Sequence, residues 1–292
     1  MYDKTGDGAV DMYDVAELFK SHENELTELK GDGDFRSPEC LSLMDEADIV
    51  VTNPPFSLFR EYVAVLMAHK KKFVIIGNKN ALTYKEIFPL FQRNKLWVGA
   101  TPMSIDLLFI MPRLVQEQLM KNKKAGSAYR VVDGQILGRS SAIWFTNLDI
   151  KKRHEEMILI KRYSPECYPK YDNYDAIEVG KTSDIPCDYA GMMGVPVTFL
   201  DKYNPEQFDI VGIAKAGAGD PALKTKEYPL QRQIDKNGKS SNVRKLNDGP
   251  AINVPAPPKS ATYYIVNGKY YIQTYARILI RNKHPEPPRE AQ

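Results

Sequence analysis

Two short apolar runs, separated by one amphipathic helix, constrain the fold of this chain more than any other feature. Residues 48–52 and 72–77 are rich in Val and Ile and have the pattern of strands that are covered on both faces. Between them, apolar side chains recur at helical spacing along residues 57–70. A strand, a helix and a strand joined by short connections form a βαβ unit. The sequence therefore predicts an α/β fold with a parallel sheet as its core.

The chain changes character near residue 165. Before that point a helix is expected at residues 84–92, with short β-type segments at 95–99, 141–147 and 156–161. After it, residues 212–258 carry repeated Gly, Pro, Lys and Asn, which predicts long loops around few regular elements. The segment 262–280 resembles a β-hairpin around Gly268.

Composition excludes several classes of protein. The chain has 292 residues, of which 43% are hydrophobic, too many for a disordered chain. No run approaches the roughly 20 apolar residues that a membrane span needs, and the first residues lack a signal-peptide pattern. The 3 cysteines are too few and too scattered for a disulfide framework or a zinc cage. We therefore expect a cytoplasmic protein with no membrane partner, and we assign no metal site.

Charge is distributed unevenly along the chain. Residues 1–50 hold 4 basic and 14 acidic residues, whereas residues 202–292 hold 15 basic and 8 acidic residues. Lysine and arginine also cluster at 70–72, 121–124 and 151–153. A basic body of this kind suits a polyanionic partner such as nucleic acid, although an ordinary solvated surface would have the same composition.

The tetrapeptide Asn53-Pro54-Pro55-Phe56 follows the first predicted strand directly, at the edge where open α/β sheets bind ligands. Each proline fixes its backbone and removes an amide donor, which leaves carbonyl oxygens in a rigid arc. The Asn53 amide oxygen and the Pro54 carbonyl can then accept from one NH2 group, while Phe56 offers a face to a planar ring. These features predict a receptor for an exocyclic amino group on a flat heterocycle. A plain strand-to-helix turn is the alternative interpretation.

Adenine's amino nitrogen is a poor nucleophile because its lone pair is delocalised into the ring. Two acceptors that hold its hydrogens favour a more tetrahedral nitrogen and direct the lone pair toward an incoming methyl group, without a strong base. In a duplex the base must first rotate out of the stack. Stacking on Phe56 would offset part of that cost, by roughly 1–3 kcal/mol.

Longer strings carry a family resemblance. Asn-Pro-Pro-Phe resembles the motif of amino-group methyltransferases that use S-adenosylmethionine. The string Asp48-Ile-Val-Val-Thr-Asn-Pro-Pro-Phe-Ser-Leu-Phe-Arg-Glu-Tyr62, with Lys72-Phe-Val-Ile-Ile-Gly-Asn-Lys-Asn-Ala81, resembles the EcoRI-type adenine-specific DNA methyltransferase family. Further similar strings are Gly31-Asp-Gly-Asp-Phe-Arg-Ser37, Trp144-Phe-Thr-Asn-Leu-Asp149, Lys170-Tyr-Asp-Asn-Tyr-Asp175, Gly194-Val-Pro-Val-Thr-Phe-Leu200 and Lys202-Tyr-Asn-Pro-Glu-Gln-Phe208. The resemblance runs from about residue 31 to the end.

The resemblance implies a Rossmann-like, S-adenosylmethionine-dependent core at residues 31–165. A loop-rich α+β region for DNA recognition would follow at 166–292, after an acidic leader at 1–30. It implies site-specific methylation of a flipped adenine in double-stranded DNA, with Asn53 to Phe56 as the target-base pocket and a cognate restriction endonuclease encoded nearby. Two alternatives remain open: an amino-methyltransferase that acts on RNA or on a protein glutamine, and a non-catalytic DNA-binding fragment.

A second set of candidate site residues lies just ahead of the first predicted strand. Asp34 could accept from the amino group of the cofactor's adenine, and Phe35 could pack on its face, which is where the resemblance places an Asp-Phe pair. A Gly/Asp turn is the alternative. Asn78 and Asn80 follow the second strand at the same edge as Asn53 and could equally line the target pocket, contact DNA or form a turn.

The amino-terminal residues depart from the family pattern. Such enzymes need an earlier strand that leads into a glycine-containing loop for the cofactor, and the residues before Gly31 hold no such pattern. We therefore expect a chain truncated at its amino end, with an incomplete core, doubtful cofactor affinity and an unpaired strand edge. Residues 3–14 partly fit a calcium loop, with Asp14 in place of the usual Glu; an acidic turn that caps a helix is the alternative.

Overall fold

The computed structural model describes residues 28–105, 107–122 and 128–287, together with the single residues 6, 17, 20 and 126. The chain divides into two compact units, residues 1–48 and residues 49–292. The predicted calcium loop at 3–14 lies outside the described residues, apart from Gly6, and so does most of the acidic leader. The division of the chain near residue 165 stays a prediction.

The small unit contains one described helix, α2 (Pro38–Glu46). Ser37 caps its amino end, because the Ser37 side chain accepts a hydrogen bond from the Cys40 amide at 3.2 Å. Pro38 occupies the first turn, where a missing N–H costs nothing. The helix therefore begins where local sequence chemistry dictates.

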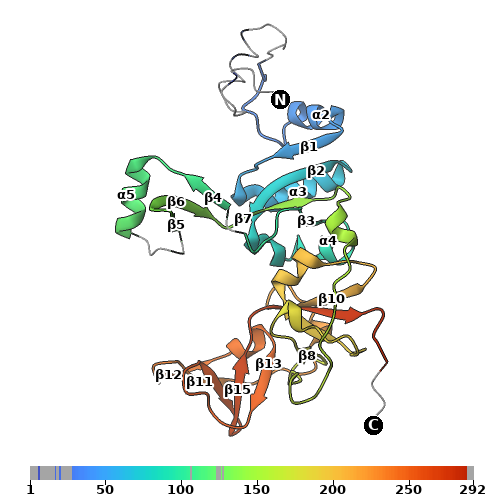
Figure 1. Ribbon diagram of the computed structural model, residues 1–292, viewed down its shortest axis with the longest axis vertical. Coiled ribbons are helices and arrows are strands. Elements are labelled where there is room, and N and C mark those ends of the chain that lie inside the picture. Colours follow the sequence, from blue (N-terminus) through green and yellow to red (C-terminus); the bar gives the residue numbers. More distant parts are fainter. Residues whose placement is uncertain are drawn as a thin grey trace. The chain divides into compact units, whose positions relative to one another are not determined.

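The large unit begins with the predicted strand–helix–strand unit (Figure 1). It consists of β1 (Ile49–Thr52), a short 3₁₀ turn η1 (Phe56–Leu58), α3 (Phe59–Ala68) and β2 (Lys72–Asn78). β1 and β2 are parallel, with Ile49 opposite Lys72 and Thr52 opposite Ile75. The prediction of a βαβ unit is confirmed.

The expected parallel core sheet is in fact mixed, because two antiparallel pairings complete it. β7 (Ala142–Thr146) pairs with β2 on one side and with β3 (Trp97–Val98) on the other, so the strand order is β1-β2-β7-β3. Gly77 lies where α3 meets the sheet: a Cβ there would overlap the Phe59 ring and lie 2.8 Å from the Phe145 ring. Only glycine permits so close an approach at this position.

One expectation about β1 was wrong. Its apolar sequence predicts a strand covered on both faces, yet Ile49 is 47% exposed and Val51 is 67% exposed. These two side chains point to the same face, because alternate residues of a strand share a face. β1 is the terminal strand of the sheet, and this face of it is largely exposed.

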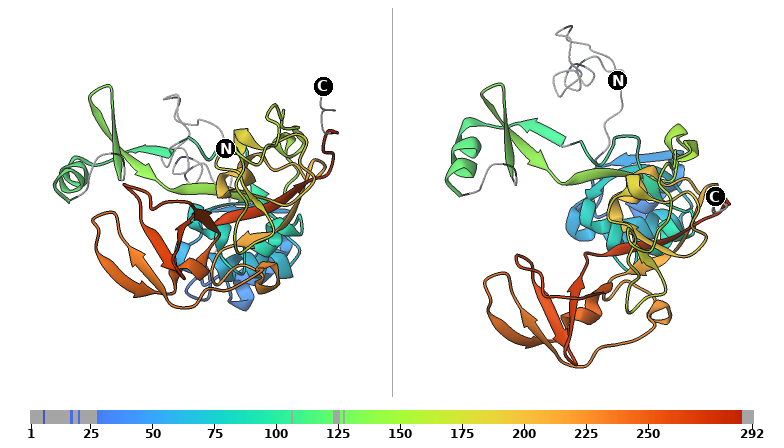
Figure 2. Two further views of the ribbon diagram at one scale, coloured as in Figure 1. Left: turned by 90° about the horizontal axis from the view of Figure 1, so that it is seen from below. Right: turned by 60° about the horizontal axis from the view of Figure 1, so that its bottom comes forward.

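An antiparallel arm interrupts the chain between β3 and β7. It consists of β4 (Leu107–Ile110), α5 (Arg113–Asn122), β5 (Tyr129–Val132) and β6 (Gln135–Ser140), with the strand order β4-β6-β5. The arm extends away from the first sheet (Figures 1 and 2). Large apolar side chains are exposed on it, including Ile110 at 78% and Leu114 at 74%. This arm was not predicted from the sequence.

The second half of the chain forms two further sheets. One has the order β10-β16-β9-β8 and the other β12-β11-β14-β15-β13. Their strands are β8 (Ile177–Glu178), β9 (Met193–Pro196), β10 (Phe208–Ala214), β11 (Gln231–Ile234), β12 (Ser240–Val243), β13 (Ala251–Val254), β14 (Tyr263–Val266), β15 (Lys269–Gln273) and β16 (Arg277–Asn282). The remaining helical segments are η2 (Lys79–Thr83), α4 (Phe88–Gln92), η3 (Lys151–His154), η4 (Thr182–Asp184), η5 (Val197–Lys202), η6 (Pro221–Leu223) and η7 (Lys245–Asp248).

Three expectations about the second half of the chain can be compared with these sheets. Residues 212–258 hold three short strands, β11, β12 and β13, between long connections, as expected. Residues 156–161 form no strand; Lys161 makes an isolated bridge to Pro186. The expected terminal hairpin is present as β14 and β15, joined at Asn267 and Gly268, which have φ angles of 49° and 75°.

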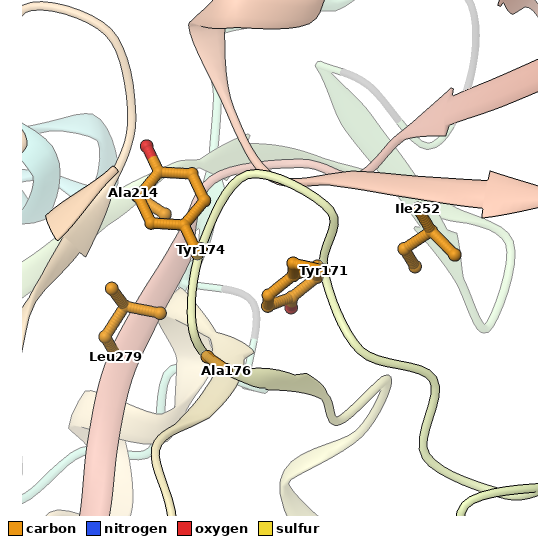
Figure 3. Packing of buried hydrophobic residues seen from close by; sticks show 6 residues of the cluster. All are labelled: Tyr171, Tyr174, Ala176, Ala214, Ile252 and Leu279. Atoms are coloured by element: carbon orange, nitrogen blue, oxygen red, sulfur yellow. The ribbon is translucent and has the colours of Figure 1, made fainter. Parts of the chain in front are cut away.

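Buried tyrosines join the two later sheets. Tyr171 and Tyr174 pack in one cluster with Ala214 of β10, Ile252 of β13 and Leu279 of β16 (Figure 3). Between these tyrosines lies Asn173, which is fully buried. Its Nδ2 donates to the Gly249 carbonyl at 3.0 Å and its Oδ1 accepts from the Ala251 amide at 2.8 Å. The string Lys170–Asp175 therefore holds the two sheets together.

Candidate functional site

The predicted receptor is an open corner at the carboxyl end of β1. Asn53, Pro54 and Pro55 leave the strand, and Phe56 begins the 3₁₀ turn η1 that leads into α3. Asn53 and Pro55 are exposed, Phe56 is 43% exposed and Pro54 is buried. The corner thus presents an amide and an aromatic ring at the surface, with one proline anchored beneath them.

The corner has two unused acceptors. Within the described part of the chain, neither the Asn53 side-chain amide nor the Pro54 carbonyl makes a hydrogen bond. The Pro55 carbonyl is occupied, because it accepts from the Leu58 amide at 2.9 Å and so closes η1. An exposed amide oxygen and a nearby carbonyl can both accept hydrogen bonds from one external NH2 group.

The corner stands on a rigid support. Phe59, the first residue of α3, is 1% exposed and its ring centroid lies 4.9 Å from that of Phe145 in β7. Phe145 is itself fully buried and also contacts Phe91. Aromatic packing therefore fixes the start of α3 against the sheet, and with it the residues that immediately precede the helix.

Asn78 ends β2 at the same edge of the sheet as Asn53, as parallel pairing requires. Its Nδ2 donates to the Ser141 hydroxyl at 2.9 Å, and its Oδ1 accepts from the Asn80 amide at 2.9 Å. Asn78 therefore caps the turn η2, which is the turn role that sequence reasoning left open. The side chain of Asn80 is exposed.

Asp34 and Phe35 lie in the small unit, ahead of α2. The Asp34 carboxylate accepts from the Arg36 backbone amide at 2.8 Å and from the Arg36 guanidinium at 2.6 Å. These hydrogen bonds lower the pKa of Asp34 to about 2. The guanidinium carbon also lies 5.4 Å from the centroid of the Phe35 ring. The turn alternative is therefore present, while the cofactor role of the pair stays a prediction.

Sequence reasoning named no functional residue beyond about 165. In that region the structure exposes the side chains of Arg232 and Asn242, which face each other across β11 and β12. The signal that could have revealed this hairpin is the dipeptide Asn237-Gly238, in which Gly238 has a φ of 81°. Among the described residues, no group of three or more His, Cys, Asp or Glu side chains is arranged to hold a metal ion. In the same residues, no helix is both long enough and apolar enough to cross a membrane.

Residues 1–283 match the sequence model of a family described as adenine-specific methyltransferase EcoRI. The chain belongs to this family. The resemblance predicted from the strings around the corner is therefore confirmed.

Similar curated proteins include the type II methyltransferase M.EcoRI of Escherichia coli, which is 48% identical over 187 residues, or 63% of this chain and 56% of that protein. M.MgeORF184P of Mycoplasma genitalium is 39% identical over 235 residues, covering 77% of this chain and 72% of that protein. M.MpnI of Mycoplasma pneumoniae is 39% identical over 214 residues, covering 72% and 66%. The matches thus span between 56% and 72% of the lengths of these family members. No solved structure matches the chain.

Proposed function

We propose that this chain transfers a methyl group from S-adenosylmethionine to the exocyclic amino group of a flipped adenine in duplex DNA. Membership of an adenine-specific methyltransferase family supports this activity, as do the names of the type II relatives. The single structural observation that carries the proposal is the exposed corner at Asn53 and Pro54, whose amide and carbonyl oxygens are unused among the described residues.

In the proposed mechanism, the Asn53 amide oxygen and the Pro54 carbonyl each accept one hydrogen of the adenine amino group. This holds the nitrogen in a geometry in which its lone pair can form the new N–C bond. Phe56 stacks on the extruded base and offsets part of the cost of unstacking it. S-adenosylmethionine supplies an electrophilic methyl group on sulfur. The amino nitrogen would take up the methyl group, release a neutral thioether and lose one proton to solvent.

The cofactor proposal rests on Asp34 and Phe35, whose chemistry fits the adenine part of S-adenosylmethionine. A carboxylate accepts hydrogen bonds at about four positions, so Asp34 can bind an amino group while it still pairs with Arg36. Phe35 can contribute an aromatic face. A Rossmann-like core belongs to the same proposal, supported by the parallel pair β1 and β2 with its crossover helix.

We also propose a DNA partner, a location and a cognate endonuclease for this chain. The basic carboxyl-terminal part suits duplex DNA, with 15 basic and 8 acidic residues in 202–292. A cytoplasmic location and a cognate restriction endonuclease encoded nearby agree with the type II names of the relatives.

The test is methyl transfer from tritiated S-adenosylmethionine to unmethylated duplex DNA, followed by digestion to nucleosides. We expect label in N6-methyladenine with the wild-type chain, and transfer that is slower by about 100- to 1,000-fold with Asn53→Ala. RNA and glutamine-containing peptides serve as competing acceptors in parallel reactions. Label in either of those instead would contradict the DNA substrate, and duplex binding without transfer to any acceptor would favour a non-catalytic DNA-binding protein.

A further inference from the structure

The antiparallel strands β11 and β12, with their connecting turn, form a ribbon at residues 231–243. β12 is the terminal strand of the five-stranded sheet, so the ribbon lies at its edge (Figures 1 and 2). Arg232 pairs directly with Asn242, and Ile234 pairs with Ser240. Directly paired residues of antiparallel strands point to the same face. The ribbon thus presents one face that carries both Arg232 and Asn242.

The two faces of this sheet differ sharply. One face carries Tyr264, Tyr271 and Val266, which are buried in a core together with Tyr228, Leu246 and Ala251. The opposite face carries Arg232, Asn242 and Ser240, which are all exposed at the ribbon end. Toward β13 the same face is covered, because Ile252 packs in the cluster of Tyr171 and Tyr174. On this open face the half-buried rings of Tyr263 and Tyr270 meet edge to face, with centroids 5.9 Å apart.

The polar groups of the open face are largely unoccupied. Arg232 donates from Nε to the Ser240 hydroxyl at 2.9 Å, which orients the guanidinium along the ribbon. Within the described residues its terminal nitrogens have no partner, and the Asn242 amide makes no hydrogen bond. A guanidinium and an amide are the two side-chain groups that bind guanine and adenine edges through paired hydrogen bonds.

The charge of the ribbon favours a polyanion. Residues 231–245 hold five basic side chains and one acidic one. The acidic side chain, Asp235, is turned inward, because its carboxylate accepts from the backbone amides of Asn237 and Lys239 at 2.8 and 2.9 Å. Lys236 and Lys239 are exposed at the tip. The hairpin turn therefore presents positive charge with its one carboxylate satisfied internally.

We propose that this ribbon enters the major groove of DNA, where Arg232 and Asn242 read adjacent base edges and Lys236 and Lys239 contact phosphates. The major groove is about 12 Å wide and admits a two-stranded ribbon, whose strands lie about 4.8 Å apart. The inference rests on the proposed function, because it assigns the sequence selectivity of that methyl transfer to this face.

The competing interpretations are a solvated hairpin with no ligand and a surface for a protein partner. Conservative variants separate them. Arg232→Lys keeps the charge and removes the planar fork, so it tests base reading rather than attraction to phosphate. Asn242→Ala removes the amide. Lys236→Ala tests the phosphate contact. Arg281→Ala is the matched control, an exposed arginine on β16 in the other sheet.

The first measurement is made without cofactor. Each variant is mixed with a random-sequence duplex library, the bound fraction is sequenced, and affinity for a fixed duplex is followed against salt by fluorescence anisotropy. We expect Arg232→Lys and Asn242→Ala to lose about 5- to 150-fold of the preference for one base pair each, while affinity for random duplex changes by less than about twofold. Lys236→Ala should weaken all duplexes alike and reduce the salt slope by about 1. Arg281→Ala should match the wild type.

The second measurement is the spectrum of methylated sites in the same library. An unchanged set of bound and methylated sequences in both Arg232→Lys and Asn242→Ala, each with a wild-type unfolding midpoint, would overturn the ribbon proposal and leave the proposed function standing. Altered binding preferences in a protein that methylates nothing would support the ribbon and count against the proposed function. Loss of all duplex binding in Arg232→Lys would also overturn base reading, since the charge is retained.

Discussion

The corner at residues 53–56 and the ribbon at residues 231–243 present polar groups in opposite ways. The corner is a stiff two-proline turn that leads into a helix whose first residue, Phe59, is 1% exposed. The ribbon is a hairpin at a sheet edge, with polar side chains on its open face. Transition-state stabilisation requires groups that are fixed before reaction, whereas groove reading tolerates side chains that adapt. The two proposals together therefore assign chemistry and recognition to separate parts of the fold.

The strongest test of this separation is Asn53→Ala. Removing one acceptor from the reacting amino group should slow single-turnover methyl transfer by about 100- to 1,000-fold, the usual effect of losing one preorganised group at the reacting atoms. Affinity for duplex DNA should change by less than about twofold, because the proposed DNA-reading face is the ribbon and not the corner. The control is Asn122→Ala, an exposed asparagine at the end of α5. Weakened DNA binding with retained methyl transfer would contradict the catalytic role proposed for the corner.

The next largest effect concerns the contacts that hold the two later sheets together. Asn173→Ala leaves the Gly249 carbonyl and the Ala251 amide without their partner in a fully buried site. We expect a loss of about 2–4 kcal/mol in the free energy of unfolding, measured by urea denaturation. Asn253→Ala, which removes an exposed amide on the same sheet, should cost less than about 1 kcal/mol. Equal losses in the two variants would show that burial of the Asn173 amide is unimportant.

Phe56→Ala should reduce kcat/KM on duplex DNA by about 5- to 150-fold, which corresponds to the roughly 1–3 kcal/mol of base–aromatic stacking. Phe56→Tyr keeps the ring and should remain close to the wild type. Because Phe56 is 43% exposed, its loss should lower the unfolding midpoint much less than loss of the buried Phe59 would. An alanine variant as fast as the wild type would remove stacking from the mechanism.

The smallest effect concerns the small unit. Arg36→Ala should raise the pKa of Asp34 from about 2 toward its ordinary value near 3.9, as followed by NMR titration. Because folding lowers the pKa of Asp34, its ionised carboxylate stabilises the folded unit. This stabilisation is fully present above about pH 4 and is lost as the pH falls through about 2. The wild-type unit should therefore lose stability in that window, and the variant should lose less. If the pKa of Asp34 is the same in the wild type and in Arg36→Ala, Arg36 does not lower it.

The corner was predictable because burial leaves a periodic trace in the sequence. The apolar runs at 48–52 and 72–77 and the helical spacing between them predicted the parallel pair, and the prolines marked the turn. The exposure of Val51 was not predictable, because an apolar run says nothing about which neighbours are present to cover it. The free acceptors of Asn53 and Pro54 likewise depend on contacts that a motif does not encode.

The ribbon was not predicted, because its strands leave no periodic apolar pattern in the sequence. Its strands read Gln-Arg-Gln-Ile and Ser-Ser-Asn-Val, which lack the apolar alternation that reveals a half-buried strand. Their partners lie far away in sequence: Gln231 is fully buried and accepts from the Leu246 amide, and Arg232 pairs with Ile265 in β14. The terminal hairpin was found because Asn267-Gly268 lies between apolar strands. The same dipeptide at 237–238 lies between polar ones.

The arm between β3 and β7 has an evolutionary consequence. β3 and β7 are adjacent hydrogen-bonded strands, and the Gly99 amide bonds to the Trp144 carbonyl at 2.8 Å just where the chain leaves for the arm. The two ends of the arm are thus held next to each other by the hydrogen bonds between β3 and β7. Lineages can lengthen, shorten or replace this excursion while the strands beneath it keep their register, which makes it a natural place for new specificities to arise.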